Sequence, residues 1–224
     1  KFLFDFFIVN FNDNFYLECN KENTHEIIQK LNQYKLRSKV ELEIEKNLIV
    51  ILTNDKNSSK IKSISKNTSV DFFDPRFKKF FKRIYLDKIF QEKINNNSDF
   101  FEINKIKYNE KRIRNSIPDF FVDSVKQKSL LMEMRFDDLN GISWEKGCFL
   151  GQEITARMKY RNIVKRKLFK IKIFFKGKVD KEVKFNREEI GYITSHNKID
   201  GFAYINLKFL DKCLDKELLS GDSI

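Results

Sequence analysis

The order of apolar patterns in the first part of the chain restricts the fold more than any other feature. Residues 2–19 predict two strands joined by a polar turn, because an aromatic and β-branched run is followed by asparagines and a second apolar run. Apolar side chains at helical spacing predict a helix over 24–34. Residues 40–45 alternate apolar residues with glutamates, which predicts a half-exposed strand that forms a hairpin with 48–52. This strand-strand-helix-strand-strand order is typical of half of a ferredoxin-like α+β domain.

The middle of the chain has longer helical patterns. Residues 54–67 are polar and weakly patterned, whereas 77–116 predict mostly helix, interrupted by an asparagine-rich stretch at 95–98. The helical pattern ends before Pro118, because a residue that precedes proline is biased away from helix. Another helix is predicted over 149–161.

The character of the sequence changes after Ile163. Residues 165–175 alternate Lys or Arg with Leu, Phe and Ile, and short strands separated by turns continue from there. These strands predict a small antiparallel β-barrel. We therefore divide the chain into a first domain at 1–162 and a second at 163–224. The chain opens on Lys1 rather than Met, directly in strand-like sequence, so we expect that part of the first domain precedes it.

The chain is strongly basic. Its 224 residues include 44 Lys and Arg against 32 Asp and Glu, which gives a net charge of +12. The lysines are scattered, without an arginine-rich run or the aromatic–basic pattern of an RNA-binding module. Direct nucleic-acid binding is therefore not expected, and a small anionic ligand suits the charge equally well. No uncharged apolar stretch approaches the ~18–20 residues of a membrane span, so no membrane partner is expected.

The cysteines argue against a metal site held by this chain alone. Cys19, Cys148 and Cys213 lie far apart, and the chain has only 2 histidines. A zinc ion or an iron–sulfur cluster needs clustered thiolates or imidazoles, so we expect no bound metal. Cysteines without an evident pairing pattern favour a reducing compartment, and we predict a cytoplasmic location.

One stretch, residues 146–161, concentrates the side chains that carry chemistry. Lys146 and Cys148 precede a predicted helix, and a nearby cation and a helix N-terminus both favour a thiolate. Gly147 and Gly151 allow positive φ or the close approach of a ligand to the backbone. The structural alternative is a half-buried cysteine in a glycine-bracketed turn beside an ordinary surface ion pair.

Two further features of this region have both a structural and a functional interpretation. Glu153 and Arg157 are four residues apart on the predicted helix and are therefore neighbours, so they form either an ion pair or ligand contacts. Trp144, just before the stretch, either packs against the protein or forms an aromatic wall for a ligand.

The stretch resembles the motif K-G-C-[YF]-x-G-Q-E-x-x-x-R of the YgfZ family of folate-binding proteins, relatives of the glycine-cleavage T-protein (an aminomethyltransferase). The positions that meet this motif are Lys146, Gly147, Cys148, Phe149, Gly151, Gln152, Glu153 and Arg157. Residues 34–40 are similar to the family's Y-x-LR-x-KV segment, 112–118 to R-x-x-x-G-IP and 191–195 to G-x-[IV]-TS. Residues 1–9 look like its GK-x-L-x-DF strand, so the resemblance covers almost the whole chain.

The chain departs from the family pattern at three places. Ser116 stands where the family has a glycine before Ile-Pro, and Asn162 stands where a glycine usually follows Tyr-Arg. T-proteins carry paired aspartates on the first strand, whereas this chain has only Asp5 there. The loss of one carboxylate weighs against aminomethyl transfer, and folate binding without this transfer stays open.

The resemblance implies a T-protein-like fold, with ferredoxin-like folate-binding structure followed by the barrel. It implies a tetrahydrofolate-binding protein that supports the assembly or repair of iron–sulfur clusters in client enzymes, including those that modify tRNA. Cys148 is the implied reactive residue, with Lys146 beside it. The implied folate contacts are Asp5, Gly147, Gly151, Gln152, Glu153 and Arg157. The expected partners are folate and iron–sulfur client or assembly proteins. A monomer is expected because the sequence has no coiled-coil pattern or apolar stripe.

Two other functions stay open. If the protein is an enzyme, the resemblance implies folate-dependent aminomethyl or one-carbon transfer, and this activity should depend on Asp5. The third possibility is a basic adaptor that associates with tRNA, which would bind RNA with a steep salt dependence. The signature cysteine and the single aspartate favour the folate-binding protein over the transferase.

Overall fold

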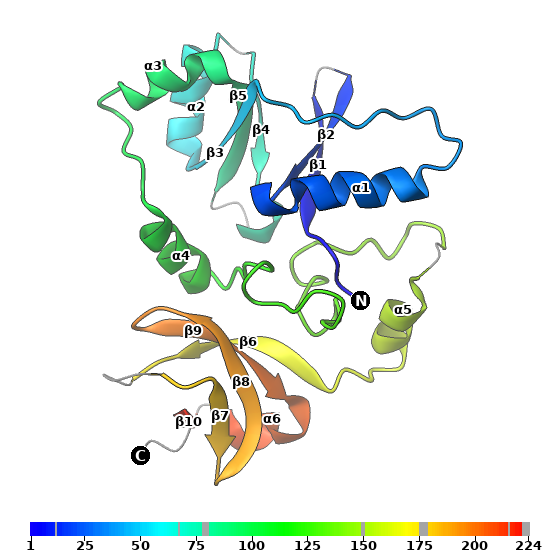
Figure 1. Ribbon diagram of the computed structural model, residues 1–224. Helices are drawn as coiled ribbons and strands as arrows, with labels where there is room; N and C mark the ends of the chain where they lie inside the picture. The colour runs from blue at the N-terminus through cyan, green and yellow to red at the C-terminus, as the bar shows by residue number, and fades with distance from the viewer. Residues whose placement is uncertain are drawn as a thin grey trace. The chain divides into compact units, whose positions relative to one another are not determined.

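The computed structural model describes residues 1–11, 13–66, 68–77, 81–148, 151–174, 179–214 and 216–220. They form two compact units, one spanning Phe4–Ile103 and one joining Lys1–Leu3 to Asn104–Ile224 (Figure 1). Both units combine helices with antiparallel strands, which confirms the α+β class. The division into domains at 1–162 and 163–224 is not tested by these units and stays a prediction.

The Phe4–Ile103 unit begins with the predicted first hairpin and helix. Strands β1 (Phe6–Phe11) and β2 (Asn14–Cys19) pair antiparallel, and α1 (Thr24–Tyr34) follows a short 3₁₀ helix, η1 (Lys21–Asn23). A separate antiparallel sheet follows, with the strands in the order β3 (Leu48–Thr53), β5 (Lys82–Asp87) and β4 (Val70–Phe73). The remaining elements are α2 (Asp55–Ile64), η2 (Pro75–Phe77), η3 (Lys88–Phe90) and α3 (Gln91–Asn95). Ile61 of α2, Ile84 and Leu86 of β5, and Phe90 and Ile94 form one buried core.

The predicted hairpin of 40–45 with 48–52 is wrong in the structure. Residues 48–52 lie in β3, but β3 pairs with β5, in the register Leu48 opposite Asp87, and 40–45 form neither helix nor strand. The connecting dipeptide explains the failure. A two-residue hairpin turn of type I′ needs positive φ at both central residues. Neither Lys46 nor Asn47 is among the residues with positive φ in the described part of the chain.

The prediction of mostly helix over 77–116 is wrong at β5. This strand is the centre of its sheet, and its four middle residues, from Arg83 to Leu86, are all buried. A strand buried on both faces loses the alternation of apolar and polar residues, so periodicity cannot distinguish it from a buried helix. The predicted interruption at 95–98 is confirmed, since α3 ends at Asn95 and the next helix, α4 (Lys105–Arg114), begins only at Lys105.

The second unit contains α4, α5 (Glu153–Tyr160) and a five-stranded antiparallel sheet. The strand order is β10 (Leu219–Ser220), β7 (Glu182–Phe185), β8 (Glu188–His196), β9 (Asp200–Asn206) and β6 (Arg166–Lys172). In Figure 1 the sheet runs from the yellow β6 to the orange β8 and β9. The turn after β9 forms η4 (Leu207–Phe209) and α6 (Leu210–Cys213), and α4 lies against β9.

The C-terminal strands are antiparallel as predicted, but in the described residues they do not close into a barrel. Strands β6 and β10 are the two edges of the sheet, and no pairing joins them. Strand β10 contributes only two paired residues, Leu219 and Ser220, which leaves too few backbone groups at that edge for closure. The core of the sheet is nevertheless apolar, with Val183, Ile193 and Ile205 buried together.

Residues 115–148 form successive turns in the second unit that bury aromatic and methionine side chains. Phe2 joins this segment, because its N–H donates to the Ser129 carbonyl at 2.9 Å and its ring lies 6.0 Å from that of Phe120. Phe120 in turn stacks on Phe136 at 4.3 Å. Glu133 is buried in the same segment, and its carboxylate accepts from Nε of Arg166 on β6 at 3.0 Å. In the described part of the chain, no helix has the length and apolar character that a bilayer crossing requires.

Candidate functional site

The residues of the signature motif lie on an exposed loop and on the helix that follows it. Lys146, Gly147 and Cys148 are all exposed, and α5 begins at Glu153 with Gln152 as its N-cap residue. Phe149, which belongs to the motif, lies outside the described residues. Gly151 and Gln152 precede the helix although the sequence predicts them within it, so the thiol does not belong to the first turn of α5. The field of a helix dipole falls off within that turn.

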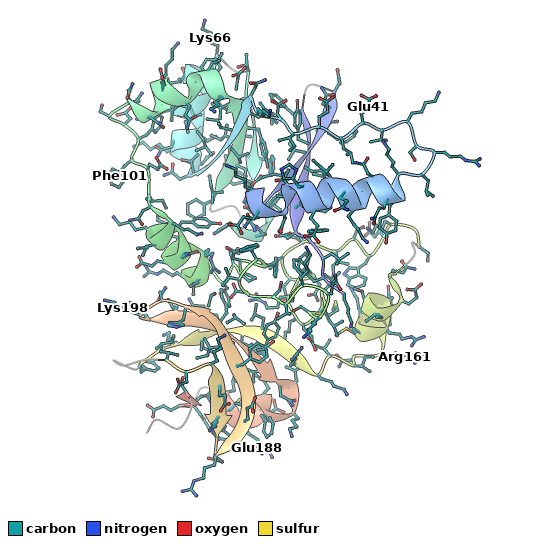
Figure 2. The ribbon with its side chains drawn as sticks, viewed as in Figure 1. Glu41, Lys66, Phe101, Arg161, Glu188 and Lys198 are labelled. Carbon is teal, nitrogen blue, oxygen red and sulfur yellow. The ribbon has the colours of Figure 1, made fainter. Side chains whose placement is uncertain are left out.

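Helix α5 attaches to the protein through one face. Met158 is buried, whereas Glu153, Ile154 and Arg157 are exposed. Glu153 and Arg157 lie four residues apart, but no salt bridge joins them in the described structure. Arg157 and Ile154 are thus both open to solvent, although Ile154 lies four residues before Met158 and therefore beside it on the helix. Figure 2 labels Arg161, the C-cap residue that follows the last helical residue, Tyr160.

Trp144 fixes the start of the loop against the end of α5. The Lys159 ammonium lies 3.9 Å from the centre of the indole ring, within the range of a cation–π interaction. The Tyr160 ring packs edge-on against the same indole at 6.3 Å. These contacts account for Trp144 as a packing residue, which is one of the two interpretations that the sequence leaves open.

The backbone conformation requires a glycine at one of the two glycine positions of the motif, but not at the other. Gly151 has a φ of +96°, a left-handed backbone that L side chains rarely adopt. Gly147 has no such requirement, because its φ lies outside that region and an added Cβ would meet no described atom within 4 Å. Neither the conformation nor the packing of the described residues therefore explains a glycine at 147.

The remaining candidate residue lies in the other compact unit. Asp5 is half-buried directly before β1, in the Phe4–Ile103 unit, whereas the motif belongs to the unit that contains α5. Lys146, Cys148, Gln152, Glu153 and Arg157 therefore lie in one segment of one unit, and Asp5 belongs to the other unit.

The three cysteines have different environments. Cys148 is exposed, Cys213 is buried and Cys19 is half-buried, with its Sγ 3.7 Å from Oγ1 of Thr24. Burial raises the pKa of the Cys213 thiol, which disfavours its reactive thiolate. Among the described residues, no group of three or more His, Cys, Asp and Glu side chains is arranged to hold a metal ion.

A cavity of about 520 Å³ opens within the C-terminal sheet. Its walls come from β6, β7, β8, β9 and α6, and Ile171, Val183, Ile193 and Cys213 are among the residues that line it. None of the candidate residues is among the described residues of this lining. The motif is therefore part of the surface of its unit rather than of this cavity.

A buried ion pair joins two other segments that carry the resemblance. Arg112 of α4 is 2% exposed and Asp123 is 0% exposed, and Nη1 of Arg112 lies 3.0 Å from Oδ2 of Asp123. Nη2 of Arg112 donates to Oγ of Ser195 at 3.2 Å, and Oγ1 of Thr194 donates to the other Asp123 oxygen at 2.7 Å. The hydroxyl of Tyr204 donates to the Asp123 carbonyl at 3.1 Å. Residues 112–118 and 191–195 thus meet in a structural network.

The backbone explains both glycines that this chain lacks relative to the family pattern. Ser116 has a φ of 62° and Asn162 a φ of 49°, so both positions adopt the left-handed conformation that glycine accommodates without strain. Position 191 requires glycine for a different reason. An added Cβ there would lie 1.9 Å from the carbonyl oxygen of Tyr204 on the neighbouring strand. These positions therefore belong to the fold rather than to a binding site.

A second buried network lies in the Phe4–Ile103 unit, and no sequence pattern predicts it. Asp74 is fully buried and accepts from Nε and Nη2 of Arg76 at 3.1 and 2.9 Å, and from Nε of Arg83 at 2.9 Å. Arg83 also binds the Glu18 carboxylate, which accepts from the hydroxyl of Tyr85 as well. Burial alone would raise the pKa of Asp74, but the two guanidinium groups outweigh it and hold this pKa below its ordinary value.

Similar proteins are iron–sulfur cluster assembly factors by name. The mitochondrial IBA57 homologue of Dictyostelium discoideum is 25% identical over 170 residues, which cover 71% of this chain and 41% of the relative. The corresponding protein of Mycosarcoma maydis is 25% identical over 162 residues, 72% of this chain and 39% of the relative. The Mus musculus protein is 33% identical over 66 residues, 30% of this chain and 18% of the relative. No family model matches the chain.

The chain spans about two fifths of the length of the first two relatives, with 41% and 39% covered. Their names agree with the iron–sulfur part of the predicted role. The predicted cytoplasmic location is wrong by this comparison, because the relatives are named as mitochondrial proteins. The argument from cysteines separates reducing from oxidising compartments only, and it cannot separate the cytoplasm from another reducing compartment.

Proposed function

We propose that this protein supports the assembly or repair of iron–sulfur clusters through the exposed thiol of Cys148, and that it binds tetrahydrofolate. The observation that carries the proposal is the placement of Cys148 on an open surface loop beside Gly147, where the described structure gives no packing reason for a glycine. The names of the similar proteins point to the same process. By the same comparison we propose a mitochondrial location.

The chemistry of the thiol limits what this chain contributes. Iron–sulfur clusters are held by about four thiolates. The chain has 3 cysteines, of which Cys213 is buried, so one exposed thiol cannot hold a cluster by itself. We therefore propose that the Cys148 thiolate binds iron of a cluster in transit, while thiolates of a partner protein supply the other ligands. Lys146 and Arg157 are exposed nearby in the sequence and add positive charge where an anionic cluster would lie.

Tetrahydrofolate has two parts that need different sites. Its pterin ring needs an apolar slot with a carboxylate, and its glutamate tail needs cations. Arg157 and Lys146 suit the tail, since both are exposed cations on the motif segment. For the ring, the motif segment offers Gln152 and the carboxylate of Glu153 beside Gly147 and Gly151, and the further proposed contact, Asp5, belongs to the other unit. The exposed cations of the motif segment therefore fit the glutamate tail, and folate is proposed as a bound ligand rather than as a reactant.

The first experiment tests the thiol. In cells that lack the protein, Cys148→Ala should fail to restore the activity of [4Fe–4S] enzymes, while Cys19→Ala should restore it, because both substitutions remove one sulfur and only Cys148 is exposed. The enzymes to assay include those that modify tRNA, which we propose as clients. Full rescue by Cys148→Ala at a normal protein level would refute the role of the thiol.

The second experiment tests folate separately. Calorimetric titration of the full-length protein with tetrahydrofolate and its formyl derivative should give binding that Arg157→Ala weakens. The absence of binding at ~1 mM ligand would remove folate from the proposal and leave the role of Cys148 to be judged by the first experiment.

A further inference from the structure

Two contacts of Trp144 close the chain around the motif. The Lys159 ammonium lies 3.9 Å from the centre of the indole ring, and the Tyr160 ring lies 6.3 Å from it at an interplanar angle of 73°. The motif begins at Lys146, two residues after Trp144. It ends at Arg157, two residues before Lys159. The whole motif therefore lies between two ends that touch, and we refer to the contacts of Trp144 with Lys159 and Tyr160 as the indole contacts.

The indole contacts are not what attaches α5 to its unit. Met158 is 5% exposed and anchors the helix, whereas Tyr160 is 73% exposed and Lys159 is exposed as well. A cation–π contact at an exposed site shifts a local equilibrium by about two- to fivefold. That factor is too small to decide whether a domain folds. The indole contacts therefore act on the segment that they close rather than on the fold as a whole.

Cys148 lies on the part of this segment that depends most on Trp144. Residues 145–147 are all exposed and lie outside helices and strands, so Trp144 is the last residue before Cys148 that is not exposed. Four residues of chain span at most about 14 Å. As long as the indole stays on the last turn of α5, the backbone of Cys148 is limited to that distance from the backbone of Trp144. Release of the indole removes this limit on the position of the thiol relative to α5.

We infer that Trp144 and Lys159 are positioning residues for Cys148. Their contact holds the loop at the end of α5, so that the thiolate and the cation of Arg157 are presented together to the cluster. The inference deepens the proposed function and rests on it, since both residues act through Cys148 rather than on the cluster. A ligand group that is held in place before binding loses less conformational entropy on binding. Breaking the contact therefore weakens the binding of iron by the thiolate without abolishing it.

The first measurement tests the contact itself. Trp144 is the only tryptophan of the chain, so quenching of its fluorescence by acrylamide reports the exposure of this indole alone. Lys159→Gln removes the ammonium and should raise the quenching constant. Lys159→Arg supplies a guanidinium, which also binds aromatic faces, and should keep the constant near that of the unchanged protein. The matched control Lys165→Gln removes another exposed lysine and should leave the constant unchanged. Equal constants in all four proteins would overturn the inference.

The second measurement tests the effect on Cys148. The protein is expressed at graded levels in cells that lack it, and the amount that restores half of the activity of the [4Fe–4S] enzymes is determined. Lys159→Gln should raise this amount about two- to fivefold, the factor of an exposed cation–π contact. Trp144→Ala should raise it at least as far, because it removes the Tyr160 contact as well. Lys159→Arg and Lys165→Gln should restore the enzymes as the unchanged protein does, and Lys159→Gln should keep the urea midpoint of unfolding.

The possible failures can be told apart. If Lys159→Gln raises quenching but not the required amount of protein, while Cys148→Ala fails to restore the enzymes, the indole contacts do not position the thiol. If Lys159→Arg performs no better than Lys159→Gln, or if the unfolding midpoint falls together with the activity, the lysine has a different or a purely structural role, and the inference is wrong. If Cys148→Ala restores the enzymes fully, the proposed function fails and the inference fails with it.

Discussion

Replacing Arg112 by methionine removes the cation of the buried ion pair between α4 and Asp123, to which the hydroxyls of Thr194 and Ser195 on β8 also bond. The guanidinium lies 3.0 Å from Oδ2 of Asp123, and it also donates to the Ile117 carbonyl at 3.3 Å and to Oγ of Ser195 at 3.2 Å. Methionine retains much of the side-chain volume and loses all of these donors. The variant therefore isolates the loss of charge and hydrogen bonds from the loss of packing.

The expected loss follows from what stays paired around Asp123. Removing one partner of a buried ion pair costs about 3–5 kcal/mol, because the other charge is left buried. In this site Asp123 keeps two donors, the hydroxyl of Thr194 at 2.7 Å and the N–H of Asp119 at 2.8 Å. We therefore expect a loss near the lower limit, about 3 kcal/mol in the free energy of unfolding.

Urea denaturation followed by circular dichroism and by the fluorescence of Trp144 measures this loss. The matched control is Arg135→Met, which breaks the Arg135–Asp138 pair, where the Asp138 side chain is 40% exposed. An exposed pair contributes about 0–1 kcal/mol, so the control should lie within that range. If Arg112→Met costs no more than Arg135→Met, the buried network does not stabilise the fold in the way that its geometry indicates.

Three further predictions follow from the backbone and from charge. Gly191→Ala should destabilise the second unit by several kcal/mol, about 3 or more, because its Cβ would lie 1.9 Å from the Tyr204 oxygen, whereas Gly147→Ala should leave the unfolding midpoint unchanged. Ser116→Gly should stabilise the protein by about 0.5 kcal/mol by relieving a φ of 62°, while Asn162→Gly should be nearly neutral because asparagine tolerates this conformation. The pKa of Asp74 is held below its ordinary value of 3.8, so its contribution to stability is present above that pH and is lost as the pH falls through the lower, folded-state pKa. Acid unfolding curves of the wild type and Asp74→Asn should therefore converge as the pH decreases, and parallel curves would contradict the argument.

Local sequence signals predicted the elements that have their own turn chemistry or clear alternation. The hairpin of β1 and β2 was predictable because a polar turn separates two apolar runs. Strand β6 was predictable because its basic and apolar residues alternate. Strand β5 was not, since its middle residues are buried on both faces and show no alternation. The strand pattern at 40–45 was recognisable, but its pairing was not, because pairing depends on the rest of the sheet.

The sequence likewise predicted some parts of the candidate site and not others. The sequence identified the motif segment, because Lys146, Cys148 and Arg157 are close together along the chain. It could not identify the network around Asp123, where the hydroxyl of Thr194 comes from a residue 71 positions away. It also could not distinguish an exposed thiol from a buried one, since the burial of Cys213 results from the packing of α6 on the C-terminal sheet.

The fold explains some of the glycine positions in the family pattern, but it does not explain Gly147. At Gly191 the neighbouring strand leaves no space for a side chain, and at Gly151 the backbone is left-handed, so the fold alone accounts for both. Ser116 shows that a left-handed position can be occupied by another residue at a cost in strain. Gly147 has neither crowding nor a left-handed φ in the described structure, yet it lies directly before the exposed Cys148. A partner or ligand that approaches the backbone beside the thiol would need the absence of a side chain at 147, which is why the proposed chemistry is assigned to this loop.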